Sequence, residues 1–109
     1  MPYQFMEQCE VRMEKKVGAH VIISGRVQGV FFRMETLRAA DRCGVCGWVR
    51  NRSDGTVEAM FEGDEARVMS ILGWCKEGPP SANVNHVDVK WEAYSGEFED
   101  FEIRYGDPF

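Results

Sequence analysis

Residues 20–43 read HVIISGRVQGVFFRMETLRAADRC, and within this stretch the spacing of apolar residues changes from that of a strand to that of a helix. The β-branched run at residues 20–24 predicts a buried strand that ends at Gly25. From about residue 30 to residue 43 the apolar side chains recur on one helical face, which predicts an amphipathic helix. The glycine-punctuated GRVQG between the two segments predicts a turn, so a strand leads through a tight loop into a helix.

Strand and helix patterns continue along the rest of the chain. Ser53-Asp54-Gly55 marks a tight turn between two strands, and Gly78-Pro79-Pro80 ends a second helical pattern. The further predicted elements are strands at residues 45–50, 56–62, 87–93 and 101–105 and a helix from 64–65 to about 76. Together with the first strand and helix they give the order βαββαβ followed by an additional strand.

The order of these elements predicts the fold class. Two amphipathic helices must bury their apolar faces against one side of the sheet, and right-handed crossovers then favour one arrangement. We therefore predict an α+β, ferredoxin-like βαββαβ sandwich with an antiparallel sheet, a core strand order of 4-1-3-2 and two helices on one face. The pattern leaves the pairing of the short fifth strand open. This fold hosts enzymes, metal carriers, RNA binders and regulatory modules, so it does not define a function.

Length and composition indicate one domain. The chain has 109 residues, of which 44% are hydrophobic and 28% charged, enough for a core of its own. Charges interrupt the apolar pairs of residues 1–16, so we expect an N-terminal extension outside the core and a folded domain over residues 17–109. No stretch approaches the roughly 18 apolar residues of a membrane span, and no signal-peptide core is present, so a cytoplasmic location is expected. The four cysteines, including the isolated pair Cys43 and Cys46, are expected to be reduced thiols rather than a zinc site.

Charge is distributed unevenly along the chain. The formal net charge of −5 argues against a general duplex-binding or anionic-membrane protein. Residues 26–52 nevertheless carry a balance of +4, whereas the rest of the chain carries −9. The arginines of this basic segment are Arg26, Arg33, Arg38, Arg42, Arg50 and Arg52. A basic segment on an acidic domain indicates a small local anion site, although scattered, solvated arginines fit the same count.

The segment GRVQGVFFR at residues 25–33 combines a glycine turn with the start of a helix. The first N–H groups of a helix have no intrahelical acceptor and lie at the positive end of its dipole. Gly25 and Gly29 allow torsions that would turn the N–H groups of residues 28–32 toward one anion. Arg33, in the first helical turn, would then donate hydrogen bonds to two oxygens of that anion. An ordinary turn followed by a solvated arginine fits the same residues, and no Walker-type Gly-Lys-Ser/Thr follows.

A second polar element ends the second predicted strand at Asn51. In a split βαβ sheet the hairpin after this strand lies near the glycine loop, so Asn51 could approach it. A neutral amide both donates and accepts hydrogen bonds, which suits holding a water beside a phosphate. The alternative is that Asn51 is simply a turn residue.

Two separated segments, GRVQGVFFR at residues 25–33 and GWVRNRSDGTVEA at residues 47–59, resemble the paired signatures of the acylphosphatase family. The resemblance extends through FEGDEARVMSILGWCKEGPPSANVNHV and the closing FEIRY, and so covers about residues 19–105. The four residues after Tyr105 depart from the family, whose members commonly end near the matching tyrosine.

The resemblance implies metal-independent hydrolysis of the carboxyl-phosphate bond of small acyl phosphates to a carboxylate and phosphate, with no cofactor. It assigns phosphate binding to Arg33 and water positioning to Asn51. It also implies a backbone cradle made by Gln28, Gly29, Val30, Phe31 and Phe32. A carboxylate leaves without needing a proton, so positioning and charge stabilisation suffice and no general acid is required. The expected partner is the small substrate, without nucleic acid or membrane, and the expected state is a monomer.

Other polar residues are expected to have structural or solvated roles. His20 and His86 lie outside both segments and are expected to be packed or solvated. Arg26, Arg50 and Arg52 would at most add a screened field near the site. The sequence pattern contains no readable pocket for the acyl group.

Two other functional classes stay open from the sequence. One is a catalytically idle anion-binding or regulatory module. A similar domain begins the larger carbamoyltransferases of hydrogenase maturation, which makes carbamoyl phosphate a reasonable substrate to test. The other is an RNA-binding ferredoxin-like domain, which the missing RNP-type strand and the charge of −5 disfavour.

Overall fold

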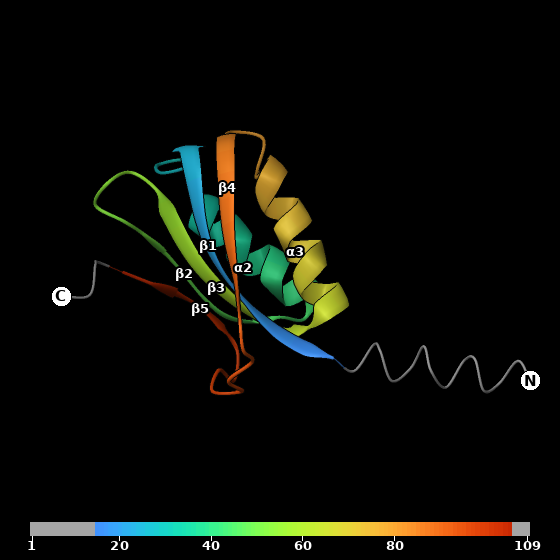
Figure 1. Cartoon of the computed structure of the whole chain (residues 1–109). Helices are drawn as coiled ribbons and strands as arrows, with labels where there is room; N and C mark the ends of the chain where they lie inside the picture. Colours follow the sequence, from blue (N-terminus) through green and yellow to red (C-terminus); the bar gives the residue numbers. More distant parts are fainter. Residues whose placement is uncertain (1–14, 106–109) are drawn as a thin grey trace, which may run out of the picture.

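The computed structural model describes residues 15–105, so what the sequence predicts for residues 1–14 and 106–109 lies outside the described part. Strands and helices follow one another in the predicted order (Figure 1). They are β1 (Lys16–Arg26), α2 (Phe32–Cys43), β2 (Cys46–Asn51), β3 (Val57–Asp64), α3 (Glu65–Glu77), β4 (Asn83–Glu92) and β5 (Phe101–Arg104). Neither helix of the described residues has the length and apolar character that a bilayer crossing requires.

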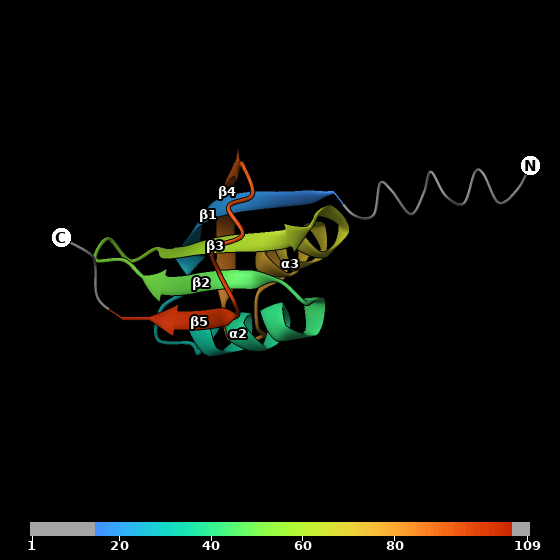
Figure 2. The same cartoon turned by 90° about the horizontal axis from the view of Figure 1, so that it is seen from below.

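The sheet has the strand order β4-β1-β3-β2-β5, which confirms the predicted core order and places the fifth strand. β1 pairs antiparallel with β3 and β4, and β2 pairs antiparallel with β3. β5 pairs parallel with β2, so the sheet is mixed rather than wholly antiparallel. Figure 2 shows the segment between β4 and β5 crossing the sheet to reach the edge of β2.

Residues 93–100, which connect β4 to β5, are hydrogen-bonded to the face of the sheet that carries no helix. The buried carboxylate of Glu62 accepts hydrogen bonds from the N–H groups of Ser95 (2.9 Å) and Gly96 (3.1 Å) and from the Ser95 hydroxyl. On the opposite face, in the core beneath the helices, Phe101 stacks on Phe61 with ring centroids 5.5 Å apart. These contacts explain why β5 lies against β2 rather than β4.

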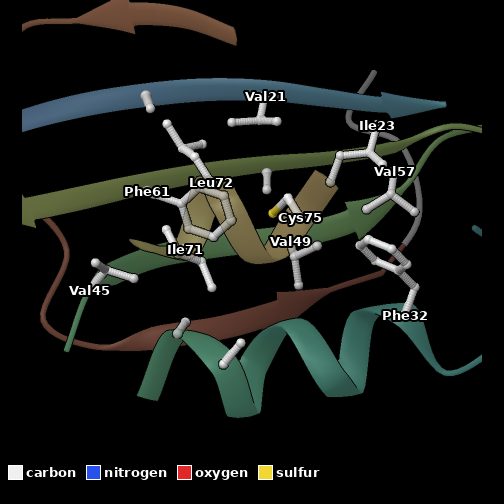
Figure 3. Close-up of a cluster of buried hydrophobic side chains, with 14 of the residues drawn as sticks. Val21, Ile23, Phe32, Val45, Val49, Val57, Phe61, Ile71, Leu72 and Cys75 are labelled. Carbon is white, nitrogen blue, oxygen red and sulfur yellow. The ribbon is translucent and has the colours of Figure 1, made fainter. Parts of the chain in front are cut away.

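The core lies between the sheet and the two helices, which cover one face (Figure 1). Alternate residues of β1 and β3 point toward the helices, as the strand pattern predicts. Figure 3 shows these side chains meeting residues of α3 and the Phe32 ring at the start of α2. The largest fully buried apolar side chains include Phe32, Phe61, Ile23 and Ile71.

Several element boundaries differ from the sequence prediction. β4 begins at Asn83 rather than at about residue 87, because its pairing with β1 continues as far as Gly25 and Arg26. The first helix begins at Phe32 rather than at about residue 30, because Phe31 adopts a left-handed conformation with φ of 62° that a helix cannot contain. β1 is longer than predicted and extends through Gly25, where an added Cβ would lie 2.2 Å from the Asn83 carbonyl oxygen. Only glycine allows this close approach of β1 to β4.

A charged cluster occupies the helix-free face of the sheet. Glu58, only 8% exposed, accepts hydrogen bonds from Arg50 (2.7 Å) and faces the His20 ring nitrogen at 2.5 Å. Burial by itself would raise the pKa of Glu58, but the hydrogen bonds from His20 and Arg50 hold that pKa below its ordinary value. His20 is therefore a packed residue, as expected, and Arg50 is neutralised by a carboxylate rather than free to attract an anion.

Candidate active site

The loop between β1 and α2 has alternating backbone handedness. Gly29 and Phe31 have positive φ values of 74° and 62°, and Val30 between them does not. Phe31 is the one non-glycine residue with positive φ among residues 15–105. Such strain in a non-glycine residue persists only where the surroundings enforce it, and it concentrates at functional sites. Alternating handedness of this kind turns successive N–H groups toward one point.

The loop presents hydrogen-bond donors rather than acceptors. The Phe31 carbonyl accepts the first helical bond from the Glu35 N–H at 3.0 Å, and the Val30 carbonyl accepts a bond from the Ser81 hydroxyl at 3.0 Å. Within the described part of the chain, the N–H groups of residues 28–33 donate to no backbone or side-chain acceptor. The start of α2, which no side chain caps, therefore offers unpaired donors at the positive end of the helix dipole.

Gln28 connects this loop to the β2–β3 hairpin. Its side-chain amide donates to the carbonyl oxygens of Arg52 and Thr56, each at 2.8 Å. These carbonyls flank the hairpin turn that follows Asn51. The Gln28 side chain thus brings the loop and the end of β2 together, which explains how residues far apart in sequence share one site.

Arg33 lies in the first turn of α2 and is half-buried. Its guanidinium stacks over the Tyr105 ring, 5.1 Å from the centroid. No carboxylate among residues 15–105 pairs with it, whereas the neighbouring Arg50 and Arg52 pair with acidic side chains. Arg33 therefore keeps its charge and its donors available for an anion.

Asn51 ends β2 and contributes a polar atom without a partner. Its side-chain oxygen is buried and accepts no hydrogen bond from any described residue. Buried polar atoms are nearly always paired, so an exception requires an explanation, and a ligand or bound water is one. This feature distinguishes Asn51 from an ordinary turn residue.

A hollow of about 280 Å³ joins these features. Among the predicted site residues, Gly29, Phe31, Phe32, Arg33 and Asn51 line it. Gln28 and Val30 do not, because the Gln28 side chain is directed at the hairpin and Val30 is buried in the core. Both can contribute only their backbone groups.

Sequence reasoning missed the remaining lining residues, which are Val27, Met34, Ile103 and Tyr105. Met34 follows Arg33 on the exposed side of α2 and carries no motif signal of its own. Ile103 and Tyr105 could not be assigned because the pattern left the position of the fifth strand open. Their alternation within FEIRY predicted a strand, but not a strand beside β2.

A family model described as acylphosphatase matches residues 19–103 of the chain. The chain belongs to the acylphosphatase family. It is 54% identical over 87 residues to an acylphosphatase of Pelotomaculum thermopropionicum, covering 80% of this chain and 95% of that protein. The structure resembles the acylphosphatase of Bacillus subtilis with a TM-score of 0.79 and 36% identity, covering 82% of this chain and 99% of that one. It also resembles part of full-length HypF in a phosphate- and nucleotide-bound form, with a TM-score of 0.75 and 28% identity, covering 83% of this chain and 12% of that one.

These relatives identify the activity. An acylphosphatase hydrolyses the carboxyl-phosphate bond of small acyl phosphates, and this chain is a hydrolase of that class. The ferredoxin-like fold predicted from the sequence is also the fold of these acylphosphatase structures. The acylphosphatase resemblance seen in the two sequence segments is thereby confirmed.

Proposed function

We propose that the hollow between the β1–α2 loop and the end of β2 is the catalytic site, where residues 28–33 bind the phosphoryl group and Asn51 orients the attacking water. One observation carries this proposal: a single hollow joins unpaired backbone donors, an unpaired guanidinium and a buried amide oxygen without a partner.

The phosphoryl group would bind to the loop through its equatorial oxygens. The N–H groups of Gln28, Gly29, Val30, Phe31 and Phe32 and the guanidinium of Arg33 supply donors of fixed direction. In phosphoryl transfer, charge spreads over these oxygens in a loose transition state, so donors arranged before the reaction stabilise it most. The stacking of Arg33 on Tyr105 limits the motion of the guanidinium and favours this arrangement.

Asn51 would hold the water that attacks phosphorus. Its amide can accept a hydrogen bond from the water and donate one to water or phosphate without adding a negative charge that would repel the substrate. A carboxylate at this position would place two anions together. The residues that line the hollow include neither a carboxylate nor a histidine nor a lysine among the described part of the chain. The leaving group is itself a stable carboxylate, so departure needs no general acid, and we propose that the reaction needs no metal ion.

The test is hydrolysis of benzoyl phosphate in the presence of EDTA, with inorganic phosphate as a competitive inhibitor. Arg33→Ala removes two charge-assisted hydrogen bonds of about 1.5–3 kcal/mol each, so the inhibition constant for phosphate should rise at least about 100-fold. Asn51→Ala should lower kcat about 100-fold or more while that constant changes less than about threefold.

Matched controls are Arg38→Ala, which removes an exposed arginine of the same helix that pairs with Glu35, and Asn85→Ala on the exposed edge of β4. Both should retain parent kinetics. Equal losses of phosphate binding in Arg33→Ala and Asn51→Ala would contradict the assigned roles. A folded parent that binds phosphate but hydrolyses nothing in EDTA would instead favour an idle anion-binding module.

We also infer that the enzyme acts as a cytoplasmic monomer. Cys43, Cys46 and Cys75 are free thiols, which suits a reducing compartment.

A further inference from the structure

Apolar side chains gather at the rim of the hollow. Six large apolar side chains are exposed among residues 15–105, and three of them, Phe31, Met34 and Tyr105, line this one feature. Phe31 is 79% exposed, Tyr105 77% and Met34 42%. Scattered exposed apolar residues need no explanation, but a group of them beside a polar site indicates a binding surface.

The rim and the floor of the hollow differ in character. Asn51 contributes a buried oxygen, whereas Met34 and Tyr105 are open to solvent. Ile103 on β5, which pairs in register with Val49, is half-buried and so less exposed than Met34 and Tyr105. Val27 and Phe32 are also buried beneath the hollow, so the Asn51 oxygen lies deep in it beside apolar groups, and the exposed apolar side chains lie at its mouth.

Transfer chemistry determines which part of the substrate faces the mouth. The attacking and leaving oxygens of a phosphoryl transfer lie roughly in line on opposite sides of phosphorus. If Asn51 orients the water at the floor, the leaving carboxylate and the acyl group attached to it must point outward. That direction leads to the rim.

We propose that the side chains of Met34, Ile103 and Tyr105 bind the acyl group and make the enzyme selective for acyl phosphates with an aromatic or bulky aliphatic acyl group. This inference rests on the proposed function, since it needs the phosphoryl group to bind at residues 28–33. Arg33 is the one charged side chain among the described lining residues, and the phosphoryl group engages it. A charged acyl group would thus find no partner. At about 280 Å³ the hollow lies just below the roughly 300–1,000 Å³ of pockets for drug-sized ligands, which suits a phosphoryl group with one small apolar substituent.

The rim also explains the role of β5 in the site. Its parallel pairing with β2 brings Ile103, and Tyr105 just after the strand, to the hollow that the β1–α2 loop also lines. Tyr105 lines the hollow and also stacks under the Arg33 guanidinium. A substitution of Tyr105 would therefore affect both acyl binding and the position of the guanidinium. The Met34 side chain carries no charge and no strong hydrogen-bonding group, so a polar substitution there tests the apolar contact with the acyl group.

The experiment compares benzoyl phosphate with acetyl phosphate in Met34→Gln, which keeps the length and helix propensity of the side chain but makes its end polar. The value of kcat/KM for benzoyl phosphate should fall about five- to tenfold, the low end expected for contacts in an open apolar site. The value for acetyl phosphate should change less than about twofold, because its methyl group is too small to cover the rim. The inhibition constant for inorganic phosphate should stay at the parent value.

Two further variants control this result. Met69→Gln makes the same change at a 54% exposed methionine of α3 that does not line the hollow, and both substrates should be unaffected. Met34→Leu keeps an apolar end and should restore most of the benzoyl preference.

The outcomes separate the two proposals. Equal losses with both substrates, or no loss with benzoyl phosphate, would overturn the acyl-binding assignment while leaving the phosphate site intact. A parent enzyme on which phosphate does not compete with either substrate would overturn the phosphate site itself.

Discussion

Gln28→Met tests how the fold holds the two halves of the site together. Methionine has nearly the shape of glutamine but cannot donate the two hydrogen bonds to the carbonyl oxygens of Arg52 and Thr56, both 2.8 Å long in the structure. Each such neutral hydrogen bond contributes about 0.5–1.5 kcal/mol net, so the free energy of unfolding should fall by about 1–3 kcal/mol. In a domain of this size each 1 kcal/mol lowers Tm by about 4–8 °C, so a decrease of at least about 4 °C is expected.

The same substitution should loosen the phosphate loop without touching its donors. Because the N–H groups of residues 28–33 would be less well fixed before binding, the inhibition constant for inorganic phosphate should rise about three- to tenfold. Thermal unfolding followed by circular dichroism and phosphate inhibition of benzoyl phosphate hydrolysis measure the two effects. Lys90→Met makes a comparable change at an exposed position of β4 and is the control. A Gln28→Met variant with Tm within about 1 °C of the parent and unchanged phosphate inhibition would show that these two hydrogen bonds do not hold the loop in place.

Three further predictions concern stability. Gly25→Ala should lower the free energy of unfolding by about 3 kcal/mol or more, because its Cβ would lie 2.2 Å from the Asn83 carbonyl oxygen. Gly73→Ala in α3, where an added Cβ would meet no neighbouring atom within 4 Å, should instead raise the free energy of unfolding by about 0.5–1 kcal/mol. Urea unfolding midpoints of both variants equal to that of the parent would contradict these two predictions. Burial raises the pKa of Glu58, but the hydrogen bonds from His20 and Arg50 outweigh burial and hold this pKa below its ordinary value of 4.5. The Glu58 carboxylate therefore stabilises the fold fully at pH values above 4.5. That stability is lost as pH falls through the lower folded pKa, so Glu58→Gln should be more destabilising at neutral than at strongly acidic pH, and a pH-independent difference would contradict this account.

The sequence predicted most of the fold because its apolar periodicities are local and unambiguous. Val57, Ala59 and Phe61 occupy alternate positions of β3, and all three are fully buried on the helix side of the sheet. The core strand order followed from two right-handed crossovers. The fifth strand is different, since its short alternating pattern fits either edge of the sheet. Its position depends on tertiary contacts such as those of Glu62 with Ser95, which no local pattern reveals.

The site was predictable to the extent that it depends on backbone donors and family motifs. Glycine spacing and a helix start indicated the loop, and the structure brings Arg33 and Asn51 to one hollow as the resemblance implied. The left-handed torsion of Phe31 was not predictable, because aromatic residues rarely adopt it without enforcement by their surroundings. The apolar rim was equally hidden, because it combines a helix residue, Met34, with residues of the strand whose place was unknown.

A crystal structure with inorganic phosphate bound would show whether the β1–α2 loop binds the phosphoryl group. We expect phosphate within hydrogen-bond distance of the N–H groups of residues 28–33, with the Arg33 guanidinium on two of its oxygens and Asn51 beside it. On the other side of β2, Arg50 and Arg104 both stack on the Trp48 ring. Phosphate bound between these two arginines, with the β1–α2 loop empty at inhibitory concentrations, would show that the loop is not the phosphate site.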